Sequence, residues 1–153
     1  MNKYYLAYGS NLNIHQMRFR CPTAKPIGTA IIPGYELLYK GSRACAFLTI
    51  EPKNGSEVPV AVWEVTADDE ARLDAYEGFP NFYYRKEMQV KVRMEDGTVR
   101  ELPAFIYIMH EKNPLGRPSP HYIRTCKEGY RDFGFDEKYL DEAYEKSAEE
   151  RAA

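Results

Sequence analysis

Near its beginning the sequence reads Tyr4-Tyr5-Leu6-Ala7-Tyr8-Gly9-Ser10-Asn11. A run of apolar and aromatic residues is followed there by a glycine and two small polar residues. A short apolar run that stops at such a turn signal predicts a buried strand. Asn11 or Asn13 can then cap a short helix that reaches Met17, because their side-chain oxygens accept hydrogen bonds from free backbone N–H groups. The stretch therefore predicts a strand, a tight loop and a helix in close succession.

The residues up to Met109 also show mostly strand patterns. The expected strands are Gly28–Ile32, Tyr35–Lys40, Ala44–Ile50, Val58–Val65, Gln89–Met94 and Val99–Met109. Turns are expected at Pro33-Gly34, Gly41-Ser42 and Asn54-Gly55. The segment Glu95-Asp96-Gly97-Thr98 predicts a hairpin, because Asp-Gly tolerates the positive φ of a type I′ turn.

Helices are fewer and lie mostly toward the end of the chain. Thr66 caps an expected helix over Ala67–Tyr76. Ser119-Pro120 begins a helix that runs to about Phe133, and Asp136 begins the last one. Because the strands cluster early and regular helices do not separate them, the pattern favours an α+β sheet or a small barrel over a doubly wound fold.

The composition bounds the class of protein. The 153 residues suit one domain, which we place at residues 1–146, with a loosely held tail over residues 147–153. A net charge of −2 argues against a nucleic-acid-binding surface, which is usually strongly basic. No apolar run approaches the roughly 20 residues that span a bilayer. We therefore expect neither a nucleic-acid nor a membrane partner.

The cysteines and tyrosines carry further information. Cys21, Cys45 and Cys126 are odd in number and show no CxxC spacing, which favours reduced thiols in the cytoplasm over a disulfide framework. The absence of a signal-peptide pattern points to the same compartment. The 13 tyrosines combine apolar bulk with a polar tip, and such an excess is typical of a polar pocket.

The loop from Tyr8 to Leu12 is the first candidate site. Successive backbone N–H groups in such a turn, at the start of a helix, form an anion site. Gly9 allows a ligand to approach the backbone closely because it has no Cβ. A small carboxylate fits this loop better than a nucleotide, since no phosphate-binding motif is present. The alternative interpretation is a turn that only ends the strand.

Glu77 is the second candidate. It stands at the C-terminal end of its helix, just before the expected cap Gly78, where the helix dipole disfavours a negative charge. Apolar and aromatic residues follow closely, and they would desolvate the carboxylate and raise its pKa toward neutrality. A carboxyl group with such a pKa serves as a general base and then a general acid. The alternative is a solvated carboxylate paired with Arg85 or Lys86.

Other catalytic arrangements fail on spacing. The three histidines have no partners at metal-ligand spacing, so no metal site is expected. Ser10 does not lie in the Gly-x-Ser-x-Gly elbow of a serine hydrolase. Cys45 lies in an apolar strand and Cys126 on the apolar stripe of a helix, so both are expected to be core residues.

Three ordered segments resemble those of the γ-glutamylcyclotransferase family. The first segment, Tyr5-Leu6-Ala7-Tyr8-Gly9-Ser10-Asn11-Leu12, resembles that family's N-terminal signature. The second, Leu73-Asp74-Ala75-Tyr76-Glu77-Gly78 followed by Tyr84-x-x-Glu87, resembles the segment with the catalytic glutamate. The third, Arg117-Pro118-Ser119-Pro120-His121-Tyr122, resembles the segment that begins a late helix. The loop reads Tyr-Gly-Ser-Asn rather than the Tyr-Gly-Ser-Leu of the branch that degrades glutathione, so glutathione becomes a less favoured substrate.

The resemblance implies a small mixed β-barrel with packed helices and a cavity at the first loop. It implies cyclisation of a γ-glutamyl amino acid to 5-oxoproline with release of the free amino acid, without a cofactor or a metal. Glu77 would be the general acid and base. The substrate-binding residues implied by the resemblance are Tyr5, Leu6, Ala7, Tyr8, Gly9, Ser10, Asn11 and Tyr122. The hydroxyl groups of Tyr5, Tyr8 and Tyr84 are candidates for the pocket lining.

Several alternatives stay open at this point. A γ-glutamylamine, such as a glutamyl group on a lysine side chain, is a rival substrate, and we expect the loop from His110 to Arg117 to help select the leaving group. A non-catalytic module could keep the pocket and bind a small ligand. A thiol-dependent amidase would use Cys21. The sequence leaves the oligomeric state open, and a homodimer is one of the states it allows.

Overall fold

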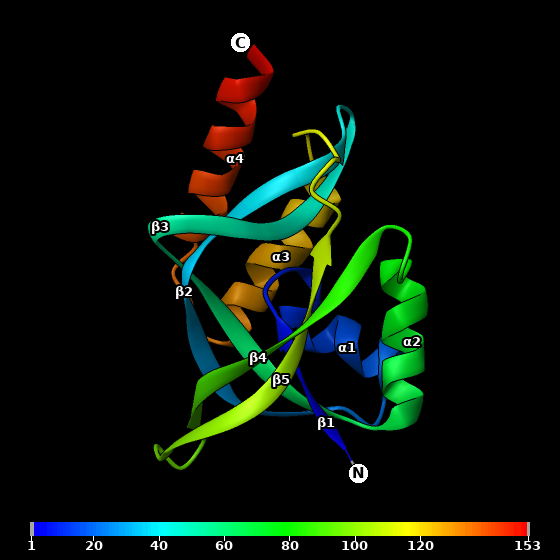
Figure 1. Cartoon of the computed structure of the whole chain (residues 1–153), viewed down its shortest axis with the longest axis vertical. Helices are drawn as coiled ribbons and strands as arrows, with labels where there is room; N and C mark the ends of the chain where they lie inside the picture. Colours follow the sequence, from blue (N-terminus) through cyan, green and yellow to red (C-terminus); the bar gives the residue numbers. More distant parts are fainter. Residues whose placement is uncertain (1, 153) are drawn as a thin grey trace.

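Five strands close into a barrel, and α-helices pack around it (Figure 1). The computed structural model describes the backbone of residues 2–152 and the side chains of residues 2–148. The elements, in chain order, are β1 (Lys3–Ala7), the 3₁₀ turn η1 (Ser10–Leu12), α1 (Ile14–Arg20), β2 (Lys25–Ser42), β3 (Cys45–Val65), α2 (Ala67–Glu77), β4 (Tyr83–Met94), β5 (Val99–Met109), α3 (Pro120–Asp132) and α4 (Lys138–Ala152).

The short strand β1 lies between β3 and β5 in the barrel wall. It pairs with β3 in antiparallel register from Lys3↔Val65 to Ala7↔Ala61. On its other side it pairs with β5 in parallel register at Tyr5↔Phe105. The resulting order is β1-β3-β2-β4-β5, closed by the β1–β5 pair. The expected small mixed β-barrel with packed helices is therefore confirmed.

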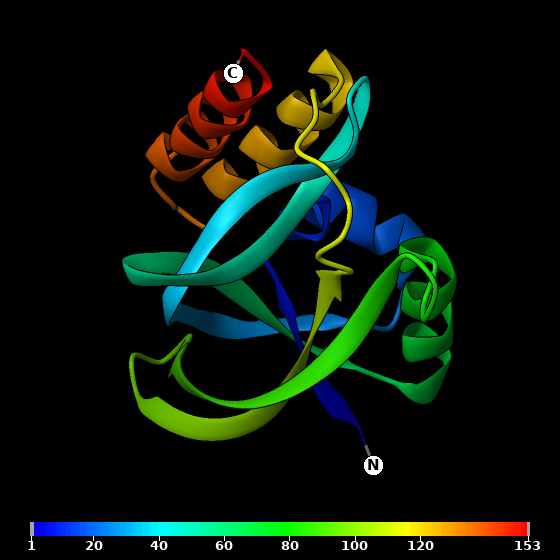
Figure 2. The same cartoon turned by 45° about the horizontal axis from the view of Figure 1, so that its top comes forward.

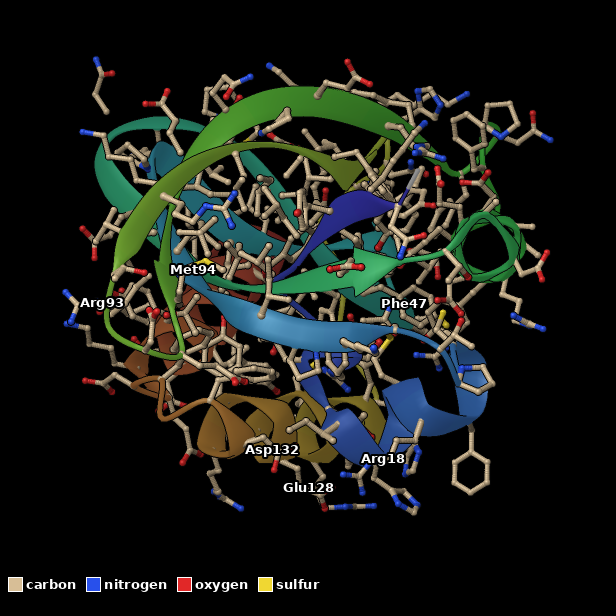
Figure 3. All side chains as sticks on the ribbon, turned by 90° about the horizontal axis from the view of Figure 1, so that it is seen from below. Arg18, Phe47, Arg93, Met94, Glu128 and Asp132 are labelled. Atoms are coloured by element: carbon tan, nitrogen blue, oxygen red, sulfur yellow. The ribbon has the colours of Figure 1, made fainter. Side chains whose placement is uncertain are left out.

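The barrel also depends on a narrow contact between β2 and β4. These strands pair only at Gly28↔Met94 and Thr29↔Arg93. A Cβ on Gly28 would lie 2.2 Å from the backbone oxygen of Arg93, which no side chain could tolerate without a shift of the strands. Figure 3 shows Arg93 and Met94 at this side of the barrel, beside β2.

The strands β2 and β3 are longer than the sequence analysis expected, and this prediction was wrong at two points. Pro33-Gly34 does not separate two strands, because β2 continues through it with a register shift between Pro33 and Tyr35. Asn54-Gly55 lies opposite this irregularity and is likewise part of the continuous strand β3. The turn-forming residues of both strands thus meet at one kink in a long ribbon. They bend the chain there without reversing it.

The remaining hairpins agree better with the expectations. Ser42 pairs with Cys45, so the chain reverses beside the expected Gly41-Ser42 turn. The hairpin between β4 and β5 is confirmed, but its turn is not type I′: Gly97 has φ +88°, whereas Asp96 lacks the positive φ that this turn type also requires. However, β4 begins at Tyr83 rather than at Gln89. Its first half mixes charged with aromatic residues, and because this composition is not typical of strands, the sequence did not predict it.

The helix caps are those that the sequence indicates. Thr66 forms a capping box with Asp69 at the start of α2, and Gly78 ends the helix at φ +63°. The Ser119 side chain accepts from Tyr122 N at the start of α3. Of the two asparagine candidates, Asn13 is the cap of α1, since its side chain accepts from Gln16 N.

The helices cover different parts of the barrel (Figures 1 and 2). In both views α3 and α4 lie side by side, while α2 lies apart from them on another side. Gly129 lets α3 approach the loop after β1, because a Cβ there would lie 2.6 Å from Asn13 N. No helix in the described part of the chain is long and apolar enough to cross a membrane.

The packed part of the C-terminal helix α4 extends beyond residue 146, where we expected the domain to end. Ser147 is fully buried in α4, and its hydroxyl donates to Ala143 O at 2.9 Å. The chain is thus still packed at the residue where we placed the start of a loose tail. The side chains of residues 149–152 and all of residue 153 lie outside the described residues, so the rest of that expectation stays a prediction.

The close approach at Gly129 gives a testable consequence for stability. We expect Gly129→Ala to destabilise the protein by about 1–3 kcal/mol, because the methyl group overpacks the contact between α3 and the Asn13 backbone. An alanine in a helix interior is otherwise favourable by about 1 kcal/mol relative to glycine, so the sign is opposite to helix propensity. Thermal unfolding measures the effect. Arg124→Ala, an exposed substitution on the same helix, serves as the control. An unchanged or higher melting temperature for Gly129→Ala would contradict the contact.

Candidate active site

The loop between β1 and α1 presents backbone donors. Its 3₁₀ turn begins where Leu12 N donates to Gly9 O at 3.1 Å, followed by Asn13 N to Ser10 O at 3.0 Å. The N–H groups of Ser10 and Asn11 precede the first of these bonds and have no acceptor within the turn. Neutral donors grouped in this way can receive a carboxylate or a developing oxyanion.

Long-range hydrogen bonds fix this loop on the barrel. The Tyr8 hydroxyl donates to Tyr107 O at 2.6 Å, across the barrel interior. Asn13 Nδ2 donates to Thr125 O and to Glu128 Oε2, each at 3.0 Å, which ties the loop to α3. Since both ends of the loop are held, its backbone donors have fixed directions before any ligand arrives.

Helix α2 is attached to the barrel one turn before Glu77. Asp74 Oδ1 accepts from the Tyr107 hydroxyl at 2.6 Å and from Arg85 Nη1 at 3.3 Å. Arg85 Nη2 also donates to Glu70 Oε1 at 2.9 Å. These contacts join α2 to β4 and β5, so that the end of α2 is held at the mouth of the barrel. They also engage Arg85, which therefore does not pair with Glu77.

The loop, the end of α2 and the barrel wall enclose a cavity of about 270 Å³. The lining residues belong to β1 and the loop after it, to β3, α2, β4, β5 and α3, and to the turn just before β4. They are Tyr5, Tyr8, Gly9, Ser10, Asn11, Phe47, Leu48, Tyr76, Glu77, Phe82, Tyr83, Tyr107 and Tyr122. A concave, mostly apolar site with a few convergent polar groups is typical of a small-molecule pocket.

Glu77 is the carboxylate of this cavity. Its side chain is partly buried, and desolvation raises its pKa from 4.5 to about 7, while the positive charge of Arg20 opposes the rise. Within the described part of the chain, no ion pair within 4 Å and no hydrogen bond engages this carboxylate. Lys86, the other expected partner, instead donates to the Tyr35 hydroxyl at 3.1 Å. Glu77 is thus poised to exchange a proton near neutral pH.

Tyrosine hydroxyls surround this carboxylate. Burial, followed by the charge of Glu77, raises the pKa values of Tyr5 and Tyr8 well above the ordinary value. Burial likewise raises that of Tyr83, with the charges of Tyr8 and Glu77 as smaller causes. These phenols stay protonated at neutral pH and act as hydrogen-bond donors. Asn11 Nδ2 donates to the Tyr5 oxygen at 2.9 Å, which leaves the Tyr5 proton available to the cavity.

Arg20 contacts both the donor loop and helix α2, and the sequence analysis did not predict its role. Its guanidinium donates to Asn11 Oδ1 and, at 3.1 Å, to Gln16 Oε1. The Arg20 Cζ lies 3.5 Å from the centroid of the Tyr76 ring. Tyr76 in turn shares a 3.1 Å hydrogen bond with Ser10 Oγ. Arg20 therefore connects the loop to the end of α2 and brings a positive charge near Glu77.

The cavity gathers most of the residues that the sequence analysis selected. Glu77, Tyr122 and the loop residues Tyr8, Gly9, Ser10 and Asn11 all line it, together with Tyr5. Leu6 and Ala7 do not line it, because both are buried in the barrel core, where they pair with Val62 and Ala61.

Tyr84 is also outside the cavity, contrary to the expectation that it lines the pocket. Successive residues of a strand point to opposite faces, so Tyr83 faces inward and Tyr84 faces outward. The Tyr84 hydroxyl donates to Glu111 Oε2 at 2.5 Å. The loop from His110 to Arg117 contributes no lining residue either; Gly116 N donates to Tyr39 O, which places this loop along β2.

No cysteine lines the cavity in the described part of the chain. Cys21 is buried, and burial raises the pKa of its thiol to about 11, so little thiolate is present at neutral pH. Cys126 is buried as expected, but the expectation that Cys45 belongs to the core was wrong, since Cys45 is exposed at the tip of the β2–β3 hairpin. Among the described residues, no three His, Cys, Asp or Glu side chains converge in a way that could hold a metal ion.

Comparison with known proteins agrees with this geometry. The profile of the family described as "Gamma-glutamyl cyclotransferase, AIG2-like" matches residues 5–126. "Gamma-glutamylcyclotransferase" of Homo sapiens is 27% identical over 142 residues, which cover 88% of this chain and 73% of the human protein. The Mus musculus protein of the same name is 25% identical over the same coverage. A solved structure described as "Gamma-glutamyl cyclotransferase" superposes with a TM-score of 0.74 at 26% identity, covering 94% of this chain and 86% of that chain.

The raised pKa of Glu77 predicts a pH-dependent cost to stability. Below pH 4.5 this carboxyl group is protonated in both the folded and the unfolded chain, and it costs nothing. Between about pH 4.5 and pH 7 the unfolded chain is ionised while the folded chain is still protonated, so the folded state loses on the order of 3 kcal/mol relative to it, and above pH 7 the loss is complete. Glu77→Gln removes this loss. We expect the variant to unfold at a higher temperature than the wild type at pH 8 and at the same temperature at pH 4.

Glu145→Gln, a substitution on the exposed face of α4, is the matched control and should change neither melting temperature. Equal stability of Glu77→Gln and wild type at pH 8 would mean that the Glu77 carboxylate is not desolvated.

Proposed function

Since the chain belongs to the gamma-glutamyl cyclotransferase, AIG2-like family, we propose that it converts a γ-glutamyl amino acid into 5-oxoproline and a free amino acid, with Glu77 as general base and general acid. The observation that carries this proposal is the position of Glu77. A carboxylate with a pKa of about 7, which no described residue engages in an ion pair or a hydrogen bond, lines the same cavity as the donor loop at Gly9–Asn11. A group with that pKa can both accept and return a proton at neutral pH.

The cavity suits the glutamyl part of the substrate. Its α-carboxylate would lie against the backbone N–H groups of Ser10 and Asn11, which have no acceptor within their turn. Its α-ammonium group would lie within reach of the Glu77 carboxylate. The protonated hydroxyl of Tyr5, whose oxygen accepts from Asn11 Nδ2, is a donor available to the γ-carbonyl oxygen as negative charge develops on it.

The reaction then needs no nucleophile from the protein. Glu77 accepts a proton from the α-ammonium group, and the free amine attacks the γ-carbonyl carbon. A five-membered ring forms, with a tetrahedral carbon that carries an oxyanion. Glu77 gives its proton to the leaving nitrogen and takes the second proton of the ring nitrogen as the bond between the leaving nitrogen and the carbon breaks. It then passes that proton to the released amine, so that the lactam and an ammonium ion leave and Glu77 is again a carboxylate. The step is an intramolecular acyl transfer that consumes no water.

Positioning supplies much of the rate acceleration in this scheme. Well-oriented intramolecular reactions gain on the order of 7–11 kcal/mol over their bimolecular counterparts. A cavity that folds the glutamyl chain into a near-cyclic shape supplies this orientation. The fixed loop and the anchored α2 support such a role, because neither has to move into place when the substrate binds.

We propose a reducing, cytoplasmic setting for this activity. All three cysteines are free thiols, and two of them, Cys21 and Cys126, are buried. A reducing compartment keeps such thiols in the state that the fold contains.

A product assay tests the proposed function. The protein is incubated with γ-glutamyl amino acids and with a γ-glutamylamine, and 5-oxoproline and free glutamate are measured separately. We expect 5-oxoproline without glutamate. Loss of the general base in Glu77→Gln should lower kcat by about 10²- to 10⁴-fold while the protein stays folded. Alkylation of the thiols should leave turnover intact. Free glutamate as the product would indicate hydrolysis, and full activity of Glu77→Gln would remove Glu77 from the mechanism.

The pH profile tests the same role independently. Because the free enzyme must hold Glu77 as a carboxylate, kcat/KM should fall about tenfold per pH unit below a midpoint near pH 7. In Arg20→Met the opposing positive charge is lost, so the midpoint should move upward. Arg18→Met is the matched control, since Arg18 lies on the outer side of α1 near Glu128 and Asp132 (Figure 3) and should leave the midpoint unchanged. A profile that is flat between pH 5 and 8, or a midpoint insensitive to Arg20, would contradict the account.

A further inference from the structure

A row of aromatic rings forms one wall of the cavity. The ring centroids of Tyr83 and Phe82 lie 5.1 Å apart, those of Phe82 and Phe47 6.3 Å, and those of Phe47 and Tyr122 5.2 Å, all in edge-to-face geometry. We call these four side chains the aromatic wall. Phe47 lies in β3, Phe82 and Tyr83 lie at the beginning of β4, just before it and at its first residue, and Tyr122 lies in α3. Figure 3 shows Phe47 on the opposite side of the barrel from Arg93 and Met94.

The aromatic wall offers apolar surface with few free polar groups. Phe47, Phe82 and Tyr122 are only partly buried, so part of each ring faces the open cavity. The two hydroxyl groups of the wall are engaged with the backbone of one residue: Tyr83 donates to Leu48 O at 2.7 Å, and Tyr122 accepts from Leu48 N at 3.1 Å. A ligand that covers these rings removes apolar area from water without losing a polar contact.

The cavity also lacks a positive charge on its surface. Its lining, taken over the described residues, includes neither lysine nor arginine, and Glu77 is its acidic member. Arg20 is engaged with Asn11, Gln16 and Tyr76 behind the loop. A charged side chain pressed against the aromatic wall would therefore lose its water without gaining a partner, which is costly.

The wall adjoins both ends of the polar site. A Cβ on Gly9 would lie 3.2 Å from the Tyr122 hydroxyl, and a Cβ on Gly78 would lie 3.3 Å from Phe82 Cβ. The polar groups that suit the glutamyl carboxylate and ammonium lie at the loop and at Glu77. When the γ-carbonyl is within reach of Glu77, the group on its far side has the aromatic wall as its neighbour.

We propose that the aromatic wall selects substrates whose leaving group is apolar: a leucine-like or phenylalanine-like amino acid, or the amine of the same skeleton. This inference rests on the proposed cyclotransferase activity and specifies its substrate class. It assigns the selection to the cavity wall rather than to the loop from His110 to Arg117, which contributes no lining residue.

The test compares leaving groups through the rate of 5-oxoproline formation. The substrates are the γ-glutamyl derivatives of leucine, phenylalanine, alanine, glutamate and lysine, the last joined through its α-amine. We expect kcat/KM for the leucine and phenylalanine substrates to exceed that for the alanine substrate by about tenfold or more, since each added methylene in an apolar pocket is worth roughly 10- to 200-fold at most. The glutamate and lysine substrates should be poorer than the leucine substrate.

A matched pair of substrates distinguishes the two sources of such a leaving group. γ-Glutamyl-3-methylbutylamide is γ-glutamyl-leucine without the leucine carboxylate. Turnover of the amide as fast as that of the leucine substrate supports the inference with an amine as the leaving group. Faster turnover of γ-glutamyl-leucine supports it with an amino acid.

Variants connect the preference to the wall. In Phe47→Ala the ratio of kcat/KM for the leucine substrate to that for the alanine substrate should fall about tenfold, because the methyl groups of leucine lose their contact. Phe82→Ala provides a second, independent reading if Phe47→Ala does not fold. Phe19→Ala removes a ring that is 77% exposed on α1 and should leave the ratio unchanged.

The outcomes separate this inference from the proposed function. Formation of 5-oxoproline with equal efficiency from all substrates, or a preference for glutamate or lysine, overturns the inference and leaves the cyclotransferase activity standing. An unchanged ratio in both wall variants also overturns it. If no substrate gives 5-oxoproline, the proposed function fails and the inference fails with it.

Discussion

The proposed activity depends on one carboxylate that is held where a negative charge is unfavourable. Glu77 ends a helix, where the dipole repels negative charge, and it is partly withdrawn from water without an ion pair among the described residues. The position is maintained because α2 is fixed elsewhere, through Asp74 and Glu70 to Tyr107 and Arg85. Natural proteins accept such local costs mainly at functional sites. The same desolvation that lowers the stability of the folded protein raises the pKa of Glu77, and this raised pKa is the basis of the reactivity that we assign to it.

The barrel gives this carboxylate its surroundings. The short strand β1 ends at the donor loop, which lies at one end of the barrel. The close contact of Gly129 with Asn13 holds the loop there. Strands β3 and β4 bring the aromatic wall to the same end. Polar recognition and apolar contact are thus carried by separate elements that meet at Glu77. In such an arrangement the recognised glutamyl group can stay constant while residues such as Phe47 set the leaving group.

Local signals in the sequence predicted much of this structure. The Thr66 and Gly78 caps, the Asp96-Gly97 hairpin and the strand before Gly9 depend on neighbouring residues only, and all were confirmed. Pro33-Gly34 was misread because a kinked strand and a turn use the same residues, and only the pairing partner distinguishes them. The ordered motifs placed Glu77 and Tyr122 at one site. Arg20, Phe47 and Tyr107 were missed because their roles arise from contacts between residues that are far apart in the sequence.

The titration of Glu77 in the free protein shows whether its carboxylate is desolvated. Carbon-13 labelling of the glutamate side chains, with Glu77→Gln to assign the resonance, gives the titration curve of this one carboxyl group by NMR. Our account predicts a midpoint near pH 7, because desolvation disfavours the charged form. A midpoint between about 4 and 5, the range of an ordinary solvated glutamate, would contradict it.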